Sequence, residues 1–296
     1  MLYFKKKYNL VCEIKLNKKL NNTSIGVIIS TYNNPAWLEK VLWGYTCQTV
    51  MPVEIVIADD GSGDETRKLV DSFRDRLPIF HVWHPDNGFQ KCRILNQALL
   101  AAKSDYLIFT DQDCIPRKDF VEVHLKYAQK GYLLSGGYVR LPMELSKKIT
   151  EEGIRSGDAF SLLWLLKGGL PLNFKCTKLV KSRNFTRFMN FITPTRATWN
   201  GCNSSGWRAD MFAVNGFNEE MQYGGEDREF GERLVNLGLK SKQIRYSAIL
   251  LHLDHNRPYK NPEAIAKNDS IRKVTRKYKI IETPRGIKQN LESRNQ

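Results

Sequence analysis

The sequence lacks a long apolar run. A membrane-spanning helix needs roughly 18–20 consecutive apolar residues. The longest candidate, AFSLLWLLKGGLPL at residues 159–172, is shorter and is interrupted by Lys167 and two glycines. The first residues alternate short apolar pieces with KKK and NKK, which is not the pattern of a secretory signal. We therefore expect no membrane span and interpret residues 159–172 as a buried or interfacial helix.

Closely paired cysteines and glycine-rich phosphate loops are also missing. The six cysteines are scattered, without the close pairs that a structural zinc site needs. Unpaired thiols in a chain of this length favour a reducing compartment, so we expect a cytoplasmic location. Neither G-x-G-x-x-G nor the P-loop pattern occurs, which argues against a dehydrogenase or a kinase-like NTPase.

Acidic residues are scarce in three segments of a chain whose formal net charge is +15. Residues 1–22 carry +5, residues 173–200 carry +6 and residues 256–296 carry +7, so the remainder is −3. Such segments are either solvated faces or surfaces that attract anionic lipid or a polyanionic substrate. No zinc-finger or helix-turn-helix pattern accompanies them, so we expect no nucleic-acid partner.

Apolar runs alternate with helical patterns between residues 24 and 110. We expect strands at 24–30, 53–58, 79–84 and 106–110, with helices beginning near Pro35, after DDGSGD and near Gln90. Continuous apolar strands separated by helices indicate an α/β fold with a mostly parallel sheet covered on both faces. A later helical pattern spans residues 226–238.

Polar residues follow each expected strand, and ligands of such sheets bind beyond the carboxyl ends of the strands. The residues expected to converge there are Thr31, Tyr32, Asp59, Asp60, Asn87, Gly88, Asp111 and Asp113. The pair Asp111 and Asp113 suits Mg²⁺ or Mn²⁺ that also binds phosphate oxygens. An isolated D-x-D is more often a turn with a helix cap, but its position on the shared edge favours the metal.

Further candidate residues lie on helices and near the end of a late apolar run. In MQYGGEDREF, two glycines allow close backbone approach to a ligand, and Glu226 and Asp227 begin a helix. Acids at a helix start are commonly only dipole partners, but the same field keeps Asp227 ionised, as a general base requires. His252 and His255 either make structural hydrogen bonds or supply nitrogen ligands to a metal. Arg93 is either solvated or reaches a phosphate.

Four stretches together resemble a family-2 glycosyltransferase: VIISTYNNPAWLEKVLWGYTCQT, EIVIADDGSGDET, RILNQALLAAKSDYLIFTDQDCIP and VNGFNEEMQYGGEDREFGERLVNLG. The resemblance implies the GT-A nucleotide-diphospho-sugar transferase fold. Asn200 to about Pro258 is similar to the galactosyltransferase-type lobe of β-1,4-galactosyltransferases and chondroitin-polymerase-like bacterial enzymes. The similarity covers residues 24–140 and 200–258. WNGCN and GFQKCRILN depart from the family pattern.

The resemblance also implies roles for individual residues. Asp113, His255 and His252 would bind a Mn²⁺ or Mg²⁺ ion, Asp227 would be the catalytic base, and Glu226 would contact sugar beside it. The donor would be held by Thr31, Tyr32, Asp59, Asp60, Arg93, Asp111 and Asn203.

We therefore expect an inverting hexosyltransferase of polysaccharide biosynthesis that uses a UDP-sugar and a glycan or lipid-linked acceptor. Peripheral contact with the inner face of the membrane is expected from the basic segments. The alternatives are a non-catalytic sugar-nucleotide or polysaccharide-binding protein and a basic peripheral membrane protein. The expected organisation is a basic segment (1–22), a nucleotide-sugar half (23–140), an acceptor and catalytic lobe (141–258) and a basic tail (259–296).

Overall fold

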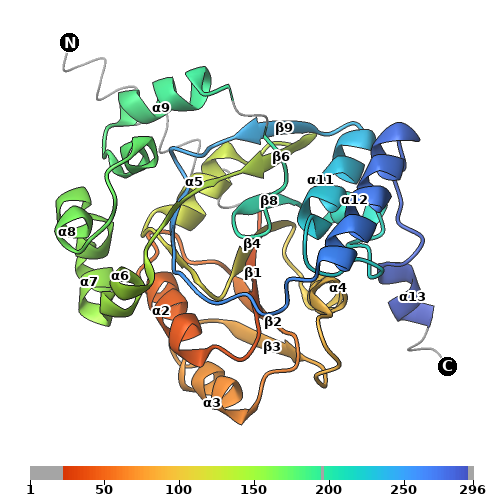
Figure 1. Cartoon of the computed structure of the whole chain (residues 1–296), viewed down its shortest axis with the longest axis horizontal. Coiled ribbons are helices and arrows are strands. Elements are labelled where there is room, and N and C mark those ends of the chain that lie inside the picture. Colours follow the sequence, from red (N-terminus) through yellow and green to blue (C-terminus); the bar gives the residue numbers. More distant parts are fainter. Residues whose placement is uncertain (1–22, 195–196, 293–296) are drawn as a thin grey trace.

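The computed structural model describes residues 23–194 and 197–292, and a seven-stranded sheet forms the centre of this part (Figure 1). The strands, in spatial order, are β3 (Ile79–Trp83), β2 (Glu54–Asp59), β1 (Ile25–Thr31), β4 (Tyr106–Asp111), β8 (Ser204–Trp207), β6 (Tyr132–Ser135) and β9 (Lys240–Gln243). The first four are parallel, β8 is antiparallel to both neighbours, and β6 and β9 are parallel. The expected mostly parallel α/β sheet is confirmed.

Helices cover both faces of the sheet, because the side chains that the central strands place on each face are apolar. Val27 and Ile29 of β1 pack on the side of α2 (Pro35–Thr46), α3 (Asp64–Ser72) and α5 (Phe120–Tyr127). Ile28 packs on the other side, with α4 (Lys91–Ala101), α10 (Arg208–Ala213) and α11 (Glu226–Asn236). Burial on two faces explains why these strands are unbroken apolar runs.

A second, three-stranded sheet connects the two halves of the chain. In it, β10 (Ile249–His252) lies between β5 (Cys114–Pro116) and β7 (Gly137–Arg140), antiparallel to the first and parallel to the second. β5 begins within three residues of the end of β4. The small sheet therefore brings β10 beside the carboxyl end of a central strand.

Short helices occupy residues 143–192 and follow one another along one edge of the molecule (Figure 1). They are α6 (Met143–Lys148), α7 (Glu151–Ser156), η1 (Asp158–Phe160), α8 (Leu162–Lys167), η2 (Phe174–Leu179) and α9 (Arg183–Ile192). The single helix expected over residues 159–172 is wrong, because α8 ends before Gly168 and Gly169, the second of which has a φ of 102°. Leu165 is buried, but Leu163 and Leu172 are exposed.

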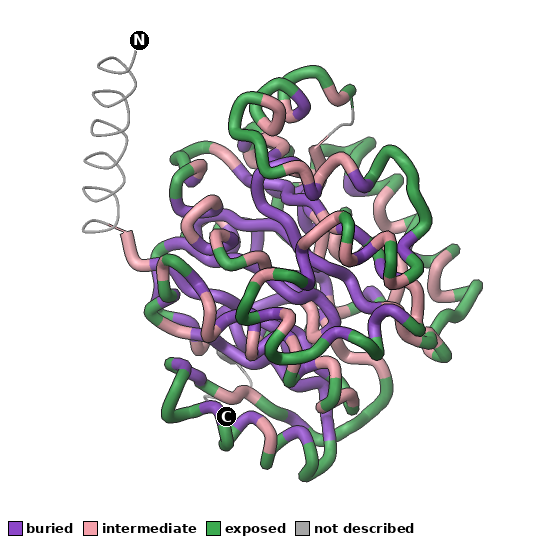
Figure 2. Tube along the Cα trace, turned by 90° about the vertical axis from the view of Figure 1, so that its left-hand side faces the viewer, coloured by how far each residue is buried: buried purple, intermediate pink, exposed green. Residues whose placement is uncertain are grey.

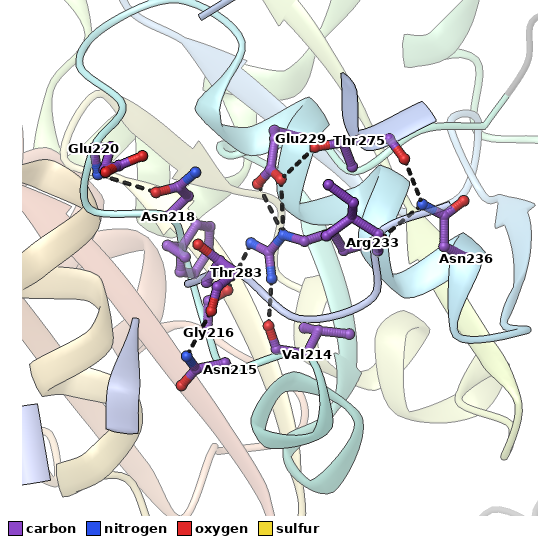
Figure 3. Close-up of polar contacts among 12 residues, drawn as sticks. Val214, Asn215, Gly216, Asn218, Glu220, Glu229, Arg233, Asn236, Thr275 and Thr283 are labelled. Atoms are coloured by element: carbon purple, nitrogen blue, oxygen red, sulfur yellow. Dashed lines mark hydrogen bonds and ion pairs between the residues drawn. The ribbon is translucent and has the colours of Figure 1, made fainter. Parts of the chain in front are cut away.

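A buried polar network fixes α11 (Figure 3). The guanidinium of Arg233 pairs with Glu229 at 2.9 Å and donates to the carbonyls of Val214 and Gly216. Thr275 of α12 (Pro262–Lys277) donates to Glu229 at 3.1 Å. A buried ion pair with all these partners is costly to break from one side. It therefore holds α11 in one position against α12 and the loop after α10.

The C-terminal region and the termini complete the description. α12 packs on α11, and Arg272 pairs with Glu232 across this contact at 2.7 Å, while α13 spans Ile287–Glu292. Most of the expected basic tail thus forms helices. Residues 1–22, expected as a basic segment, lie outside the described residues. Within the described part of the chain, every helix is too short or too polar to span a bilayer.

Candidate active site

A cavity of about 1080 Å³ opens at the carboxyl ends of β1 and β4. This is the volume of a pocket for a ligand the size of a nucleotide sugar. Nine of the twelve residues to which the family resemblance gave a site role line it: Thr31, Tyr32, Asp60, Asp111, Asp113, Glu226, Asp227, His252 and His255. The edge expected from the order of the strands is therefore the edge where the cavity lies.

The first wall, called the strand-end wall, consists of Ser30, Thr31, Asp111 and Asp113. The register pairs Ser30 of β1 with Asp111 of β4, and the Ser30 hydroxyl donates to the Asp111 carboxylate at 2.5 Å. Gln112 turns toward the loop after β1, where its side chain bonds both the N–H and the carbonyl of Tyr32 at 3.0 Å. The middle residue of the D-x-D therefore ties two loops together.

Lys91 is a cavity residue that the sequence analysis missed. It is the first residue of α4, and its Nζ lies 2.7 Å from Asp111 Oδ1. Burial opposes its charged form, but the negative charges of Asp111, Glu226 and Asp227 raise its pKa above the usual value. The sequence could have indicated Lys91 by its position, because the first residue of a helix that follows a parallel strand lies beside the ligand site.

Strand pairing brings the histidines to Asp113. His252 of β10 pairs with Cys114 of β5, and the N–H of Leu253 donates to the carbonyl of Asp113 at 2.8 Å. Asp113 Oδ2 lies 2.9 Å from His255 Nε2 and 3.6 Å from His252 Nδ1. One carboxylate and two imidazoles thus meet although 139 residues separate Asp113 from His252.

These side chains fit a divalent metal ion. The Nδ1 of His255 lies 2.8 Å from the carbonyl of Asn256, and a hydrogen bond there directs Nε2 toward Asp113, as is usual for ligating histidines. Burial alone would raise the pKa of Asp113, but the hydrogen bond from His255 and the charges of both histidines lower it to about 2. The bond to Asp113 raises the pKa of His255. Carboxylate oxygens and imidazole nitrogens are both common ligands of divalent metal ions in proteins.

The second wall, called the helix wall, consists of Gly224, Gly225, Glu226 and Asp227. Both glycines have positive φ, 114° and 92°, which other residues adopt only with strain. The Asp227 carboxylate accepts the N–H of Gly201 at 3.0 Å, and Glu226 accepts the N–H of Gly224 at 2.8 Å. Burial, and then the charge of Asp227, raise the pKa of Glu226 to about 7. The wall therefore offers two carboxylates with different surroundings.

Two family models match the chain. The model described as glycosyl transferase family 2 matches residues 26–179, and the one described as N-terminal domain of galactosyltransferase matches residues 186–256. The chain belongs to glycosyl transferase family 2. The expected family is confirmed, and the matches reach further than residues 24–140 and 200–258, since they include most of the short-helix segment.

Curated relatives of this family-2 glycosyltransferase include two bacterial enzymes. The chain is 32% identical over 239 residues to validoxylamine A glucosyltransferase from Streptomyces hygroscopicus subsp. limoneus. This match covers 75% of the chain and 50% of that protein. The chain is 27% identical over 234 residues to chondroitin synthase from Pasteurella multocida strain Pm70, covering 73% and 23%. The chain thus spans half or less of the length of these two relatives.

Solved glycosyltransferase structures share the fold. Residues 1–349 of S. aureus TarS in complex with UDP-GlcNAc align with a TM-score of 0.58 and 17% identity, over 90% of this chain and 69% of that one. The mannosyltransferase PcManGT from Pyrobaculum calidifontis, in complex with GDP-Man and Mn²⁺, aligns with a TM-score of 0.54 and 16% identity, over 87% and 72%. The expected GT-A fold is confirmed.

The structure does not bring three of the named residues of this glycosyltransferase into the cavity. Asp59 is buried beneath it, where it accepts from the Ser62 N–H and pairs with His81, each at 2.8 Å. Asn203 is fully buried and donates to the Gly137 carbonyl at 2.8 Å. Arg93 is exposed and lies outside the cavity lining. Asp59 and Asn203 are buried and Arg93 is exposed, so none of the three lies in the cavity lining, and their expected donor contacts stay predictions.

The donor-side residues that do line the cavity are tied to its loops. Asp60 pairs with His84 at 2.8 Å and accepts the Gln90 N–H at 3.0 Å. The Tyr32 hydroxyl donates to Asp86 at 2.8 Å, and this bond raises the pKa of Tyr32. These bonds fix the loops after the first three strands around one end of the cavity.

Other cavity residues are ones that the sequence analysis did not name. Phe89, Tyr223 and Tyr259 form an aromatic cluster with ring centroids 4.8 to 6.1 Å apart, and all three line the cavity. Burial raises the pKa of Tyr259 to about 12. α12 contributes Asp269 and Arg272 to the lining. A region interpreted as a basic tail thus completes the cavity.

Proposed function

We propose that this family-2 glycosyltransferase is an inverting, metal-dependent hexosyltransferase that moves a sugar from a UDP-sugar to a hydroxyl of a glycan or lipid-linked acceptor. The observation that carries the proposal is the single cavity that holds the Asp113 and histidine cluster on one side and Asp227 on the other. A leaving diphosphate needs positive charge, and an attacking hydroxyl needs a base.

Asp227 is the proposed base. It lies in the first turn of α11, and the hydrogen bond from the Gly201 N–H fixes one of its carboxylate oxygens. As the acceptor oxygen bonds to the anomeric carbon, its proton passes to Asp227 and the bond from that carbon to the diphosphate breaks. One displacement from the opposite face inverts the configuration.

The leaving side is the strand-end wall. Asp113, His255 and His252 would hold a Mn²⁺ or Mg²⁺ ion, which when bound supplies positive charge to the leaving diphosphate. Lys91 adds a fixed positive charge beside Asp111. Thr31, Tyr32, Asp60 and Asp111 are the proposed donor contacts.

The UDP-sugar and the glycan acceptor rest on similarity. TarS is described in complex with UDP-GlcNAc, and chondroitin synthase is named for a glycan product. PcManGT is described with GDP-Man, so a GDP-sugar is the competing donor. The Mn²⁺ in that complex supports a metal at Asp113.

A donor screen tests the proposal. The purified chain is incubated with UDP-, GDP- and dTDP-sugars and Mn²⁺, and release of nucleoside diphosphate is followed with and without glycan acceptors. We expect a UDP-sugar to be consumed, acceptor to accelerate release, chelation to stop it, and NMR to show an inverted anomeric centre. A retained configuration, or turnover unaffected by chelation, would contradict the mechanism.

The alternative is a non-catalytic sugar-nucleotide or polysaccharide-binding protein. The same assay separates the two, because a binding protein would retain the donor and release no UDP on addition of any acceptor. The presence of Asp227 in the same cavity as the Asp113 and histidine cluster favours the enzyme.

A further inference from the structure

Helix α9 presents an apolar face to solvent. Phe191 is 89% exposed and Phe188 58% exposed, and with Ile192 they occupy one side of the helix at spacings of three and four residues. Met189, which lies about 100° around the helix from Phe188, is buried. Large apolar side chains gathered on an exposed face indicate an interaction site.

The orientation of α9 is fixed from its inner side. Asn190 donates to the Ser247 hydroxyl at 2.8 Å and accepts the Tyr246 N–H at 2.9 Å. Gln243 of β9 donates to the Asn190 carbonyl at 2.9 Å. Rotating the helix to bury its phenylalanines would break all three bonds, so the outward apolar face is built into the fold.

The neighbouring segment continues this surface. Helices α8, η2 and α9 follow one another along the same edge of the molecule (Figure 1), and Figure 2 faces that side and shows exposed stretches of chain there. Together they form what we call the α8–α9 surface: Leu163, Leu172, Phe174, Phe188, Phe191 and Ile192, all exposed.

The segment of the chain that carries the α8–α9 surface, residues 159–209, has charge of one sign. The sequence contains no Asp or Glu between Asp158 and Asp210. Exposed cations in the same segment include Lys167, Lys175, Lys181 and Arg187. Cations beside exposed aromatic and leucine side chains are typical of elements that lie in the interface of an anionic bilayer.

We propose that the α8–α9 surface binds an anionic lipid bilayer. The apolar side chains project from several short helices, and a fluid bilayer accepts such separate side chains, whereas a protein partner needs a complementary shape. The bound face also connects to the cavity: Lys178 of η2 donates to the carbonyl of Tyr138 at 3.0 Å, and Tyr138 lines the cavity. Binding would hold the cavity next to the lipid surface. This inference does not depend on the proposed donor or mechanism.

Sedimentation with vesicles tests the proposal. We expect the chain to bind vesicles of equal parts phosphatidylcholine and phosphatidylglycerol, and to bind phosphatidylcholine alone at least about tenfold more weakly. The double variant Phe188→Ser/Phe191→Ser should lower binding to the anionic vesicles about tenfold. Arg187→Glu/Lys175→Glu should do the same and weaken the salt dependence.

The control is Phe80→Ser, which removes a phenylalanine 54% exposed on β3 and should bind like wild type. Transfer to a small water-soluble acceptor should be unchanged in all these variants. Absence of vesicle binding, or wild-type binding by Phe188→Ser/Phe191→Ser, would overturn the proposal. A lipid-free dimer that the same substitutions convert to a monomer would also overturn it, because the surface would then belong to a second copy.

Discussion

The two walls of the cavity are built in different ways. On the strand-end wall, Asp111 is placed by the register of β1 and β4, in which it pairs with Ser30. On the helix wall, Asp227 depends on two glycines with positive φ and on the buried Arg233 that fixes α11. The first wall is a consequence of sheet formation, whereas the second requires contacts among segments far apart in the sequence.

Charge divides the two walls in the same way. Three groups that can carry positive charge surround the aspartates of the strand-end wall: Lys91, His252 and His255. The helix wall carries Glu226 and Asp227, with the charge of Asp227 raising the pKa of its neighbour. The first therefore suits a diphosphate and a metal, and the second suits removal of a proton. Substitutions on each wall should separate donor binding from chemistry.

Asp113→Ala should have the largest effect. We expect transfer to fall by about 10³-fold or more, because several kcal/mol of charge stabilisation would be lost with the metal. Mn²⁺-dependent donor binding, measured by calorimetry, should be lost as well. If the variant still bound donor with a normal Mn²⁺ dependence, Asp113 would not be a metal ligand.

Asp227→Asn should lower kcat by about 10²-fold or more while leaving donor affinity close to wild type, since general-base catalysis contributes about that factor. Single-turnover kinetics and calorimetry on one preparation measure both quantities. If donor affinity fell by the same factor as kcat, Asp227 would take part in donor binding, and the two walls would not separate donor binding from proton removal.

Glu226 predicts a pH-dependent stability. Because its pKa in the folded state is raised to about 7, the folded protein holds this proton more tightly than the unfolded chain does. Protonated Glu226 therefore adds to the free energy of unfolding. This addition is fully present at pH values below the pKa of a carboxyl in the unfolded chain, and it is lost as the pH rises through about 7. It amounts to about 3 kcal/mol at most.

Urea unfolding at pH 5 and pH 8 measures this contribution. In Glu226→Gln, the difference in the free energy of unfolding between pH 5 and pH 8 should be smaller by the contribution of Glu226. In Glu65→Gln, at an exposed position of α3, this difference should be the same as in wild type. Equal pH dependence in wild type and Glu226→Gln would show that Glu226 titrates normally.

Lys91→Met should weaken donor binding about tenfold, as expected for loss of one partly buried charge beside a phosphate. Arg93→Met is the matched control, two residues along the same helix, and should change donor affinity less than about twofold because Arg93 lies outside the cavity lining. The reverse order of effects would restore the donor role that the sequence indicates for Arg93.

The predictability of each region follows from how it is stabilised. The four parallel strands begin and end within about one residue of the ranges expected from the sequence, because strands buried on both faces leave unbroken apolar runs. The sequence indicated Arg93 and not Lys91, because a motif gives residue type and spacing, whereas successive side chains on a helix point about 100° apart. The burial of Asn203 could not be predicted, because nothing in the sequence marks its partners, Gly137 and Ala248.

The burial of the short helices was unpredictable for a different reason. The apolar residues of α9 recur at helical spacing, but the spacing does not show which of them face the core, and Phe188 and Phe191 are exposed whereas Met189 is buried. The roles of the individual site residues stay predictions until the substitutions are made.

The ladder between β5 and β10 also has a consequence for the order of folding. It joins Cys114 to His252, 138 residues later. Closing so long a loop is slow compared with the pairing of β1, β2 and β4. We therefore expect the central strands to pair before β10, which carries His252, pairs with β5. Pulsed hydrogen exchange during refolding should protect β4 amides before those of β10, and simultaneous protection would contradict this. A chain still being synthesised would then have the aspartates but not the histidines, and its metal affinity would arise only near completion of the lobe.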